Sequence, residues 1–338
     1  MTKFAVMGGG DSSPADTVAV AQQAEELGFD TVWLGEGRLT GSCIPNMSIG
    51  LYNTKNIKFG TGILPYRTRN VGLLAGTFKT LDEMAPGRTK MGLGPWWEPL
   101  ASRTGLKNSK PLKAMREVIT VSKELLAGRS VTFHGEFVDV TDIRFDSPWN
   151  DDGHGYAVPI YIGAVRFGMV ELSGEIADGV LLDFLLPPSY TAQAWEAIRR
   201  GAARSGRDLS AFDVPQLIAC SVNDDDPQQA IDACKKFMAQ YIAQQSHITE
   251  YCGADPELIA AIKGILGWPG TEAQILEAMK LVPNELVRAN CACGTSTQVM
   301  DKLSEWVDVG VTEIVVTAFG DKKHTIDTIG RNAAAVSA

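Results

Sequence analysis

Four carboxylates stand just after strand-like segments, where the chain turns into a loop. They are Asp11, Glu36, Glu98 and Asp183. A carboxylate can donate or accept a proton in catalysis when burial or a neighbouring charge brings its pKa close to the working pH. We therefore take Asp11, Glu36 and Glu98 as candidate catalytic residues, and Asp183 as a candidate lining residue of a substrate pocket.

Each candidate catalytic residue also has a structural interpretation. Glu36 is alternatively an acid at a helix N-terminus that backbone donors satisfy. Asp11 precedes Ser12-Ser13-Pro14, a pattern typical of helix caps. Glu98 follows two tryptophans and precedes a proline, so it is either desolvated, with a raised pKa, or exposed to solvent. We favour the functional interpretation for Glu36 and leave both interpretations open for the other two.

Two adjacent indoles, Trp96 and Trp97, follow Gly94-Pro95 in one loop. Large aromatic side chains in a loop bury their surface against a neighbour. That neighbour is an inserted helix, a substrate or a flavin-like ring. We expect both tryptophans to line the substrate pocket.

The sequence gives no pattern for a metal site. The six cysteines include one close pair, Cys291 and Cys293, and no C-x-x-C spacing. No histidine lies close in sequence to that pair. We expect all four histidines in solvated loops or at the surface: His134, His154, His247 and His324. P-loop and G-x-S-x-G motifs are also absent from the sequence.

Charge and hydropathy narrow the class of protein. The 31 Lys and Arg against 40 Asp and Glu give a net charge of −9, which disfavours nucleic acid as a partner because the summed field repels polyanions. The longest apolar runs fall far short of the roughly 20 residues that cross a bilayer. The first residues show no secretory signal pattern, so we expect a cytoplasmic protein that acts on a small molecule.

Strand-like runs alternate with helix-like segments along the chain, which is typical of parallel βα units. The eight predicted strands are 3–7, 31–35, 57–63, 89–93, 159–163, 179–182, 214–222 and 313–317. The predicted helices are 15–27, 71–84, 112–127, 190–205, 226–244, 256–266, 271–281 and 295–309.

Eight units predict a single α/β domain over residues 1–338, a (β/α)8 TIM barrel. Two stretches exceed a normal connection: a hairpin-containing insertion at 129–156 after the fourth strand, and a helical insertion at 246–293 after the seventh. A doubly wound sheet is the alternative. It is disfavoured because Gly8-Gly9-Gly10 lacks the G-x-G-x-x-G spacing.

A barrel brings the C-terminal ends of its strands to one face, where TIM-barrel enzymes place their functional residues. Glycine stands at or next to five of the first six predicted strand ends. Glycine lets the main chain approach a flat ligand or a phosphate, although it also begins ordinary βα turns. We interpret the pattern as a sign of a bound cofactor.

Several segments resemble the bacterial luciferase-like superfamily. They are residues 57–67, 80–88, 91–95, 158–164 and 175–180. Within it, Gly92-Leu93-Gly94-Pro95, residues 220–225 and residues 310–312 resemble the branch that uses the deazaflavin coenzyme F420, especially its methylenetetrahydromethanopterin reductases and phthiodiolone ketoreductases. The resemblance runs from Phe4 to about Gly330 and is weakest in the second insertion. It implies the same barrel, F420 as cofactor with FMN as the alternative, and a homodimer or larger homo-oligomer.

The resemblance also assigns cofactor-binding residues. It places the family's non-prolyl cis peptide at Gly62–Ile63, behind the deazaflavin ring, and Glu36 against the cofactor. The coenzyme's tail would lie on the backbone of Gly163, Ala164 and Val165. Arg166 stands where the family's usual Gly-Pro begins, so its guanidinium can pair with a phosphate or carboxylate of that tail.

The departures from the family fall at its catalytic positions. Many relatives carry Asp-His where this chain has Glu36-Gly37. The reductases carry a glutamate where Met7 aligns, and sugar- and alcohol-oxidising relatives carry one where Trp97 aligns. We therefore expect a different substrate, with Met7 in its pocket. Asp183 aligns with a phosphate contact of sugar-phosphate-using relatives, and a carboxylate there favours a neutral or cationic substrate.

The resemblance implies hydride transfer between the deazaflavin C5 and a C=O, C=N or C=C carbon, with a carboxylate or water handling the proton. One alternative is an FMN-dependent luciferase-like monooxygenase. The other is a catalytically silent member of the family that binds a cofactor, because the usual histidine and glutamates are missing.

Overall fold

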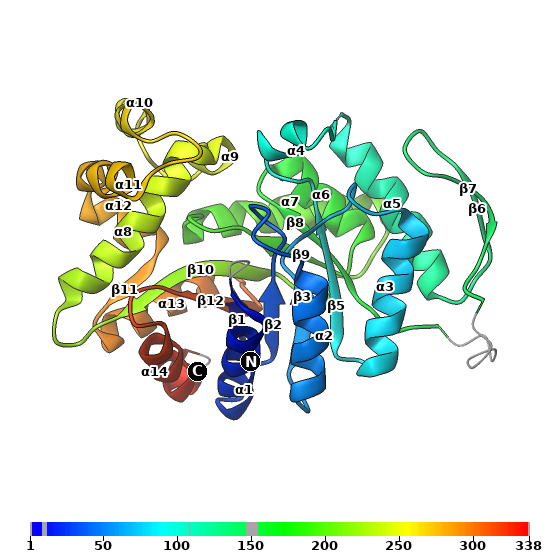
Figure 1. Ribbon diagram of the computed structural model, residues 1–338, viewed down its shortest axis with the longest axis horizontal. Helices are drawn as coiled ribbons and strands as arrows, with labels where there is room; N and C mark the ends of the chain where they lie inside the picture. The colour runs from blue at the N-terminus through cyan, green and yellow to red at the C-terminus, as the bar shows by residue number, and fades with distance from the viewer. Residues whose placement is uncertain (1, 9–11, 108, 147–154, 337–338) are drawn as a thin grey trace.

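The computed structural model describes residues 2–8, 12–107, 109–146 and 155–336, and within them eight parallel strands close into a barrel (Figure 1). Neighbouring strands pair in chain order. Lys3 of the first strand lies opposite Glu313 of the last, and Gln216 opposite Leu182 completes the ring. The barrel strands are β1 Lys3–Gly8, β2 Thr31–Leu34, β3 Lys58–Thr61, β5 Thr89–Gly94, β8 Ile160–Ala164, β9 Gly179–Leu182, β10 Pro215–Val222 and β12 Glu313–Ala318. The predicted TIM barrel is confirmed.

Helices surround the barrel and connect its strands. They are α1 Pro14–Glu26, α2 Cys43–Asn53, α3 Val71–Met84, α5 Pro111–Leu126, α6 Phe167–Ile176, α7 Pro188–Ser205, α8 Pro227–Gln244, α13 Ser296–Asp308 and α14 Lys322–Val336. Ser13 caps α1 in a capping box with Asp16, so the cap we had considered for Asp11 comes from Ser13. Asp11 itself lies outside the described residues.

Of the helices around the barrel, α2, α6 and α14 were not predicted. Pro45 stands in the first turn of α2, where a proline is tolerated. In α6, Gly174 packs against the main chain of α7, because a Cβ at this position would lie 2.2 Å from the carbonyl oxygen of Ile198. Proline therefore stands at the entry of α2, and glycine allows the close packing of α6 against α7.

Two segments extend the barrel on opposite sides (Figure 1). The predicted hairpin forms from β6 Val131–His134 and β7 Asp139–Ile143, which pair antiparallel. Short helices follow α8: α9 Ser246–Thr249, α10 Pro256–Ile265, α11 Glu272–Ala278, the 3-10 turn η1 Met279–Leu281 and α12 Asn284–Asn290. They lead to the short strand β11 Ala292–Gly294, which pairs with β10.

The third predicted strand is interrupted at the mouth of the barrel. β3 ends at Thr61, and pairing with β5 resumes in the two-residue strand β4, Leu64–Pro65. Between them the Gly62–Ile63 peptide bond is cis, as the family resemblance implied. The Gly62 N–H donates to the Leu34 carbonyl, and the Ile63 carbonyl accepts from the Glu36 N–H at 3.0 Å. This bulge faces the C-terminal ends of the strands.

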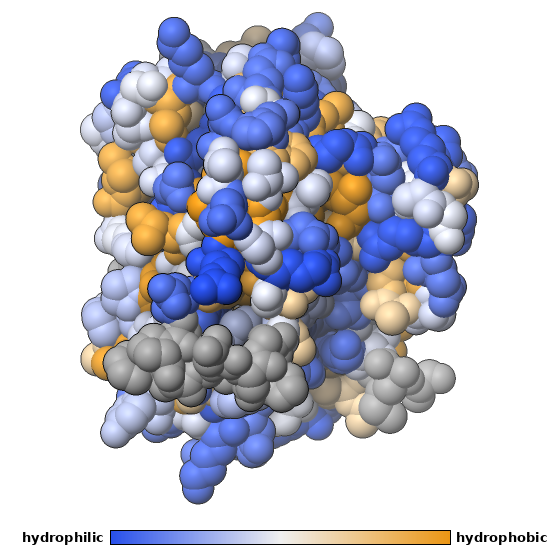
Figure 2. All heavy atoms as spheres, turned by 90° about the vertical axis from the view of Figure 1, so that its right-hand side faces the viewer, coloured by the Kyte–Doolittle hydropathy of each residue, from blue (hydrophilic) through white to orange (hydrophobic). Residues whose placement is uncertain are grey.

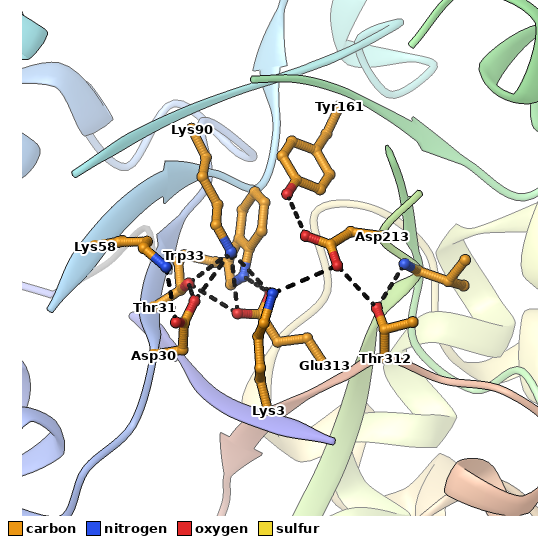
Figure 3. Close-up of polar contacts among 11 residues, drawn as sticks. Lys3, Asp30, Thr31, Trp33, Lys58, Lys90, Tyr161, Asp213, Thr312 and Glu313 are labelled. Carbon is orange, nitrogen blue, oxygen red and sulfur yellow. Dashed lines mark hydrogen bonds and ion pairs between the residues drawn. The ribbon is translucent and has the colours of Figure 1, made fainter. Parts of the chain in front are cut away.

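A buried polar network fills the opposite end of the barrel (Figure 3). The Lys90 Nζ lies 3.1 Å from Oε1 of Glu313, whose Oε2 accepts from the Trp33 Nε1–H at 3.0 Å. Burial works against the ionised form of Asp30, but the charges of Lys90 and Lys58 outweigh it and hold the pKa of Asp30 well below its usual value. The network lies at the N-terminal ends of the strands, the end that stabilises a TIM barrel rather than binding its substrate.

Candidate functional site

A small pocket opens at the C-terminal ends of the strands, in front of the Gly62–Ile63 bulge. Its volume is about 160 Å³. Its lining residues come from the ends of β3, β5, β8 and β9, from within β10 and from α9: Gly62, Ile63, Gly94, Pro95, Gly163, Ala164, Val165, Leu181, Asp183, Leu217 and His247. Most of this wall is main chain and apolar side chain, with Asp183 and His247 as its ionisable members.

Glycines shape the wall around Ile63. A Cβ at Gly163 would lie 2.3 Å from Cγ2 of Ile63, and one at Gly94 would lie 2.8 Å from its Cγ1. A Cβ at Gly35 would lie 2.8 Å from the Gly62 carbonyl oxygen. The glycines at three strand ends therefore make room for the bulge. This reason for glycine differs from the two that we had considered, the approach of a ligand and the formation of a turn.

Arg166 lies beside the pocket, at the N-cap of α6. Its Nη2 is 2.7 Å from Oε1 of Glu250, and the side chains of the pair are 64% and 45% exposed. The neighbouring Gly163, Ala164 and Val165 line the pocket as the resemblance implied. An exposed ion pair contributes only about 0–1 kcal/mol, so Arg166 can exchange Glu250 for another anion.

Glu36 is held at the mouth by three groups of donors. Its carboxylate accepts from Arg69 at 2.8 and 2.9 Å, from the Ser42 hydroxyl at 2.7 Å and from the Cys43 N–H at 3.2 Å. Burial works to raise the pKa of Glu36, but the hydrogen bonds from Arg69 and Ser42 outweigh it and lower the pKa. A carboxylate held in its ionised form is a poor proton donor. The Glu36 carboxylate instead links the start of α2 to Arg69 through hydrogen bonds.

Glu98 does not occupy the desolvated environment that we had considered. Its side chain is exposed, and Oε2 accepts from the hydroxyl of Ser102 at 2.6 Å and from its N–H at 3.3 Å. Ser102 belongs to the one-turn helix α4, Leu100–Arg103. Glu98 therefore stabilises a local turn.

The two tryptophans pack against other parts of the protein. The Trp96 Nε1–H donates to the Gly37 carbonyl at 2.8 Å. The Trp97 Nε1–H donates to the Gln244 carbonyl at 3.1 Å, and its ring meets Trp268 edge to face with centroids 4.8 Å apart. Of the three neighbours considered for Trp97, the structure shows the inserted segment. Neither indole is among the residues that line the small pocket.

Met7 and Asp183 differ in their relation to the pocket. Met7 is half-buried at the end of β1, packs against the core and is not among the lining residues. Asp183 follows β9 and lines the pocket as expected. Its Oδ2 lies 3.7 Å from Nε2 of His247.

His247 corrects the expectation that the histidines are solvated loop or surface residues. It lies on α9 and lines the pocket, with its side chain 33% exposed. No local motif marks this residue in the sequence, because its position depends on how the segment after α8 folds back over the barrel. His324, by contrast, is exposed on α14, as expected.

Arg38 adds a cation that we had not singled out. Its guanidinium lies over the Trp97 ring at 5.3 Å, and its buried Nη2 has no hydrogen-bond partner within the described part of the chain. Burial lowers the pKa of Arg38, an effect that Tyr241 partly offsets. Burial and the charge of Asp183 raise the pKa of Tyr241. Arg38 and Asp183 both interact electrostatically with Tyr241, and we call these three residues the polar rim; of the three, Asp183 lines the pocket.

The cysteines do not form a metal site in the part of the chain that the structure describes. All six are buried, and no group of three or more His, Cys, Asp or Glu side chains there is arranged to hold an ion. Nor does any described helix combine the length and hydropathy needed to span a bilayer.

Comparison with known sequences places these features in a family. The profile of the family described as luciferase-like monooxygenase matches residues 1–313. A 5,10-methylenetetrahydromethanopterin reductase of Methanolobus tindarius is 31% identical over 314 residues, covering 92% of this chain and 93% of the relative. An F420-dependent glucose-6-phosphate dehydrogenase of Nakamurella multipartita is 30% identical over 225 residues, covering 63% of this chain and 65% of that enzyme.

A solved structure agrees with the sequence matches. The coenzyme F420-dependent tetrahydromethanopterin reductase of Methanopyrus kandleri superimposes with a TM-score of 0.85 at 27% identity. The superposition covers 98% of this chain and 97% of the reductase. The similarity therefore includes the segments that extend the barrel as well as the barrel itself.

Proposed function

The chain belongs to the luciferase-like monooxygenase family and to its coenzyme F420-dependent oxidoreductases, and we propose that it transfers hydride between C5 of the deazaflavin and a C=O, C=N or C=C carbon of a small molecule. The observation that carries this proposal is the glycine-walled pocket in front of Gly62–Ile63, with Asp183 and His247 at its edge. Bound F420 supplies the hydride chemistry, and the protein supplies orientation and proton exchange.

The residues present fit a deazaflavin. Gly62, Gly94 and Gly163 add no side chains to the wall, and Ile63 fills the space beside Gly94 and Gly163. A flat ring can therefore lie against the Ile63 side chain and the neighbouring main chain. Ile63 would support the ring from behind, and the backbone of Gly163-Ala164-Val165 would hold the beginning of the coenzyme's tail. Arg166, whose side chain is exposed and forms the ion pair with Glu250 described above, would contact the tail's anionic groups.

Proton exchange needs a group that faces the substrate. Glu36 is engaged by Arg69 and Ser42 and is held in its ionised form, and Glu98 is exposed beside α4. Asp183 and His247 line the pocket. We therefore infer that proton exchange takes place at the edge of the pocket formed by β9 and α9, while Glu36 positions the start of α2.

The rim indicates a neutral, oxygen-bearing substrate. Asp183 disfavours a phosphorylated molecule that would bring a second anion into the pocket. Arg38 has a buried Nη2 that lacks a partner within the described residues and can donate to a carbonyl or hydroxyl oxygen. Arg38→Gln should raise KM for such a substrate by about tenfold, the equivalent of one hydrogen bond to a charged group, and leave F420 affinity unchanged.

The test of the proposed function is hydride exchange. Reduced F420 is mixed with the protein and a panel of small ketones, aldehydes, imines and enones, and oxidised F420 is followed by its absorbance. Protein-dependent oxidation with one class of acceptor supports the proposal. Tight F420 binding with no exchange across the panel, in either direction, supports the catalytically silent alternative.

We also propose that the protein is a homodimer. Apolar side chains lie exposed on the neighbouring helices α2 and α3: Tyr52 is 86% exposed and Leu73 is 73% exposed. Apolar side chains also gather among polar ones on the side of the molecule that Figure 2 shows. Light scattering should report a dimer that Tyr52→Glu with Leu73→Glu converts to a monomer, whereas Leu276→Glu on α11 should leave the mass unchanged.

A further inference from the structure

The two ionisable residues of the pocket, Asp183 and His247, come from parts of the chain that are far apart in sequence. Asp183 follows β9, whereas His247 comes from α9, after α8 has led the chain away from the barrel. The distance of 3.7 Å between Nε2 of His247 and Oδ2 of Asp183 suits an ion pair and exceeds that of a direct hydrogen bond. Both side chains line the pocket, so Nε2 is available to a substrate atom there.

The segment that carries His247 is anchored by the residues that follow the histidine. Next to His247, Ile248 is fully buried. A few residues on, the Tyr251 ring packs edge to face on Tyr190 and Phe167, with centroid distances of 5.1 and 5.5 Å. These rings come from the starts of α7 and α6. The histidine is thus held over the pocket by buried packing, as a group that acts on a bound molecule must be.

We propose that His247 exchanges the proton with the substrate and that Asp183 positions its imidazole, an inference that rests on the proposed hydride transfer. In the reducing direction, the substrate carbon gains a C–H bond from the hydride that reduced F420 supplies. The π pair of the C=O or C=N bond moves to the heteroatom, which takes the proton from Nε2 of His247. The imidazole regains a proton from solvent through its exposed edge. In the oxidising direction, Nε2 accepts the proton.

Groups on α8 and at the start of α6 interact with the two carboxylates next to this histidine. Tyr241 on α8 lies close enough to Asp183 for the two to interact electrostatically. Glu250 follows α9 and is paired with Arg166 at the N-cap of α6. The Asp183 carboxylate, whose Oδ2 lies 3.7 Å from Nε2, is therefore placed to pair with the imidazole, because a carboxylate attracts a protonated imidazole.

The experiment compares His247→Gln with His324→Gln, a matched change at an exposed histidine on α14. F420 affinity is measured by tryptophan fluorescence, and kcat is measured against pH. We expect His247→Gln to keep its F420 affinity, to lose about 10²- to 10⁴-fold in kcat, and to flatten the dependence of kcat on pH that the wild type shows. Added imidazole should restore part of the rate of His247→Ala. His324→Gln should behave as the wild type.

A second readout does not depend on turnover. In protein labelled with ¹⁵N-histidine, the ring nitrogen signals of His247 report its tautomer and hydrogen bonds. We expect Asp183→Asn to change these signals while those of His324 stay fixed. A substrate analogue bound with F420 should shift the signals of His247 in the wild type. Unchanged His247 signals in Asp183→Asn would overturn the positioning role of Asp183.

The outcomes separate this inference from the function on which it rests. A wild type that transfers hydride, with a His247→Gln variant that transfers it equally fast, overturns the role of His247 and leaves the proposed function standing. A wild type that binds F420 and transfers no hydride overturns both. A variant that loses kcat but not F420 affinity, with rescue by imidazole, supports both.

Discussion

At the mouth of the barrel, Arg69 donates two hydrogen bonds to the Glu36 carboxylate, at 2.8 and 2.9 Å. The same carboxylate accepts from Ser42 and from the first N–H of α2, so one residue fixes a helix, a loop and an arginine. Its contacts resemble those of a structural acid at a helix N-terminus, the alternative that we had ranked second. At the scale of the residue, therefore, Glu36 stands at a position typical of catalytic residues but stabilises the loops and the helix at the mouth of the barrel.

Glu36→Gln should destabilise the protein in a way that depends on pH. Because the folded state lowers the pKa of Glu36, the stabilisation is present above the unfolded pKa of about 4.3 and is lost as the pH falls below it. We expect a loss of about 1–3 kcal/mol at pH 7, measured by urea unfolding, and a smaller difference from the wild type at pH 3.5. Glu26→Gln on the exposed face of α1 is the control. An equal loss at both pH values would contradict this account.

Arg166 and Glu250 give the second prediction at the residue scale. If Arg166 contacts the anionic tail of F420, Arg166→Gln should weaken F420 binding about tenfold, the equivalent of one charge-assisted hydrogen bond. Glu250→Gln removes the competing carboxylate, which lies 2.7 Å from Arg166, and should keep or increase the affinity. Titrations at low and high salt provide the check, because an exposed ion pair is screened. A loss of F420 affinity in Glu250→Gln would contradict a contact between Arg166 and the anionic tail of F420.

At the scale of the element, the bulge between β3 and β4 requires space on the neighbouring strands. Gly94 ends β5 and Gly163 lies in β8, and both face the side chain of Ile63. Their lack of a Cβ lets the Ile63 side chain fill the space behind the pocket. The strand ends, the bulge and the pocket wall therefore form one packing unit.

Gly163→Ala tests this unit. Its Cβ would lie 2.3 Å from Cγ2 of Ile63, so the bulge must move and F420 affinity should fall, with a stability loss of about 1–3 kcal/mol. Adding Ile63→Ala should recover part of the stability. Gly37→Ala is the matched control, because nothing lies within 4 Å of a Cβ there. Equal F420 affinity in Gly163→Ala and the wild type would show that the bulge is not part of the cofactor site.

The base of the barrel carries the other prediction at this scale. The side chains of Lys90 and Glu313 are 5% and 2% exposed, and each is the ion partner of the other. Lys90→Met leaves the Glu313 carboxylate buried without that partner and should cost about 3–5 kcal/mol in urea unfolding. The double variant with Glu313→Gln should cost less than the sum of the single changes. Additive losses would show that the two charges do not depend on each other.

At the scale of the whole molecule, the order of the barrel strands could be predicted because each is a short apolar run bounded by glycine, proline or a polar turn. Helix α6 could not, since Gly168 and Gly174 are read as breaks until the close approach of α7 is known. The position of the bulge came from the family resemblance, and no local pattern showed it. His247 was missed because its place over the pocket depends on long-range folding of the segment after α8.

The central claim is that this barrel binds F420 at the glycine-walled pocket. The most direct measurement is a titration of the purified protein with F420 and, separately, with FMN, followed by tryptophan fluorescence, in the wild type and in Gly163→Ala. We expect saturable binding of F420, little binding of FMN, and weaker F420 binding in the variant. Selective binding of FMN, or F420 binding that Gly163→Ala leaves unchanged, would contradict it.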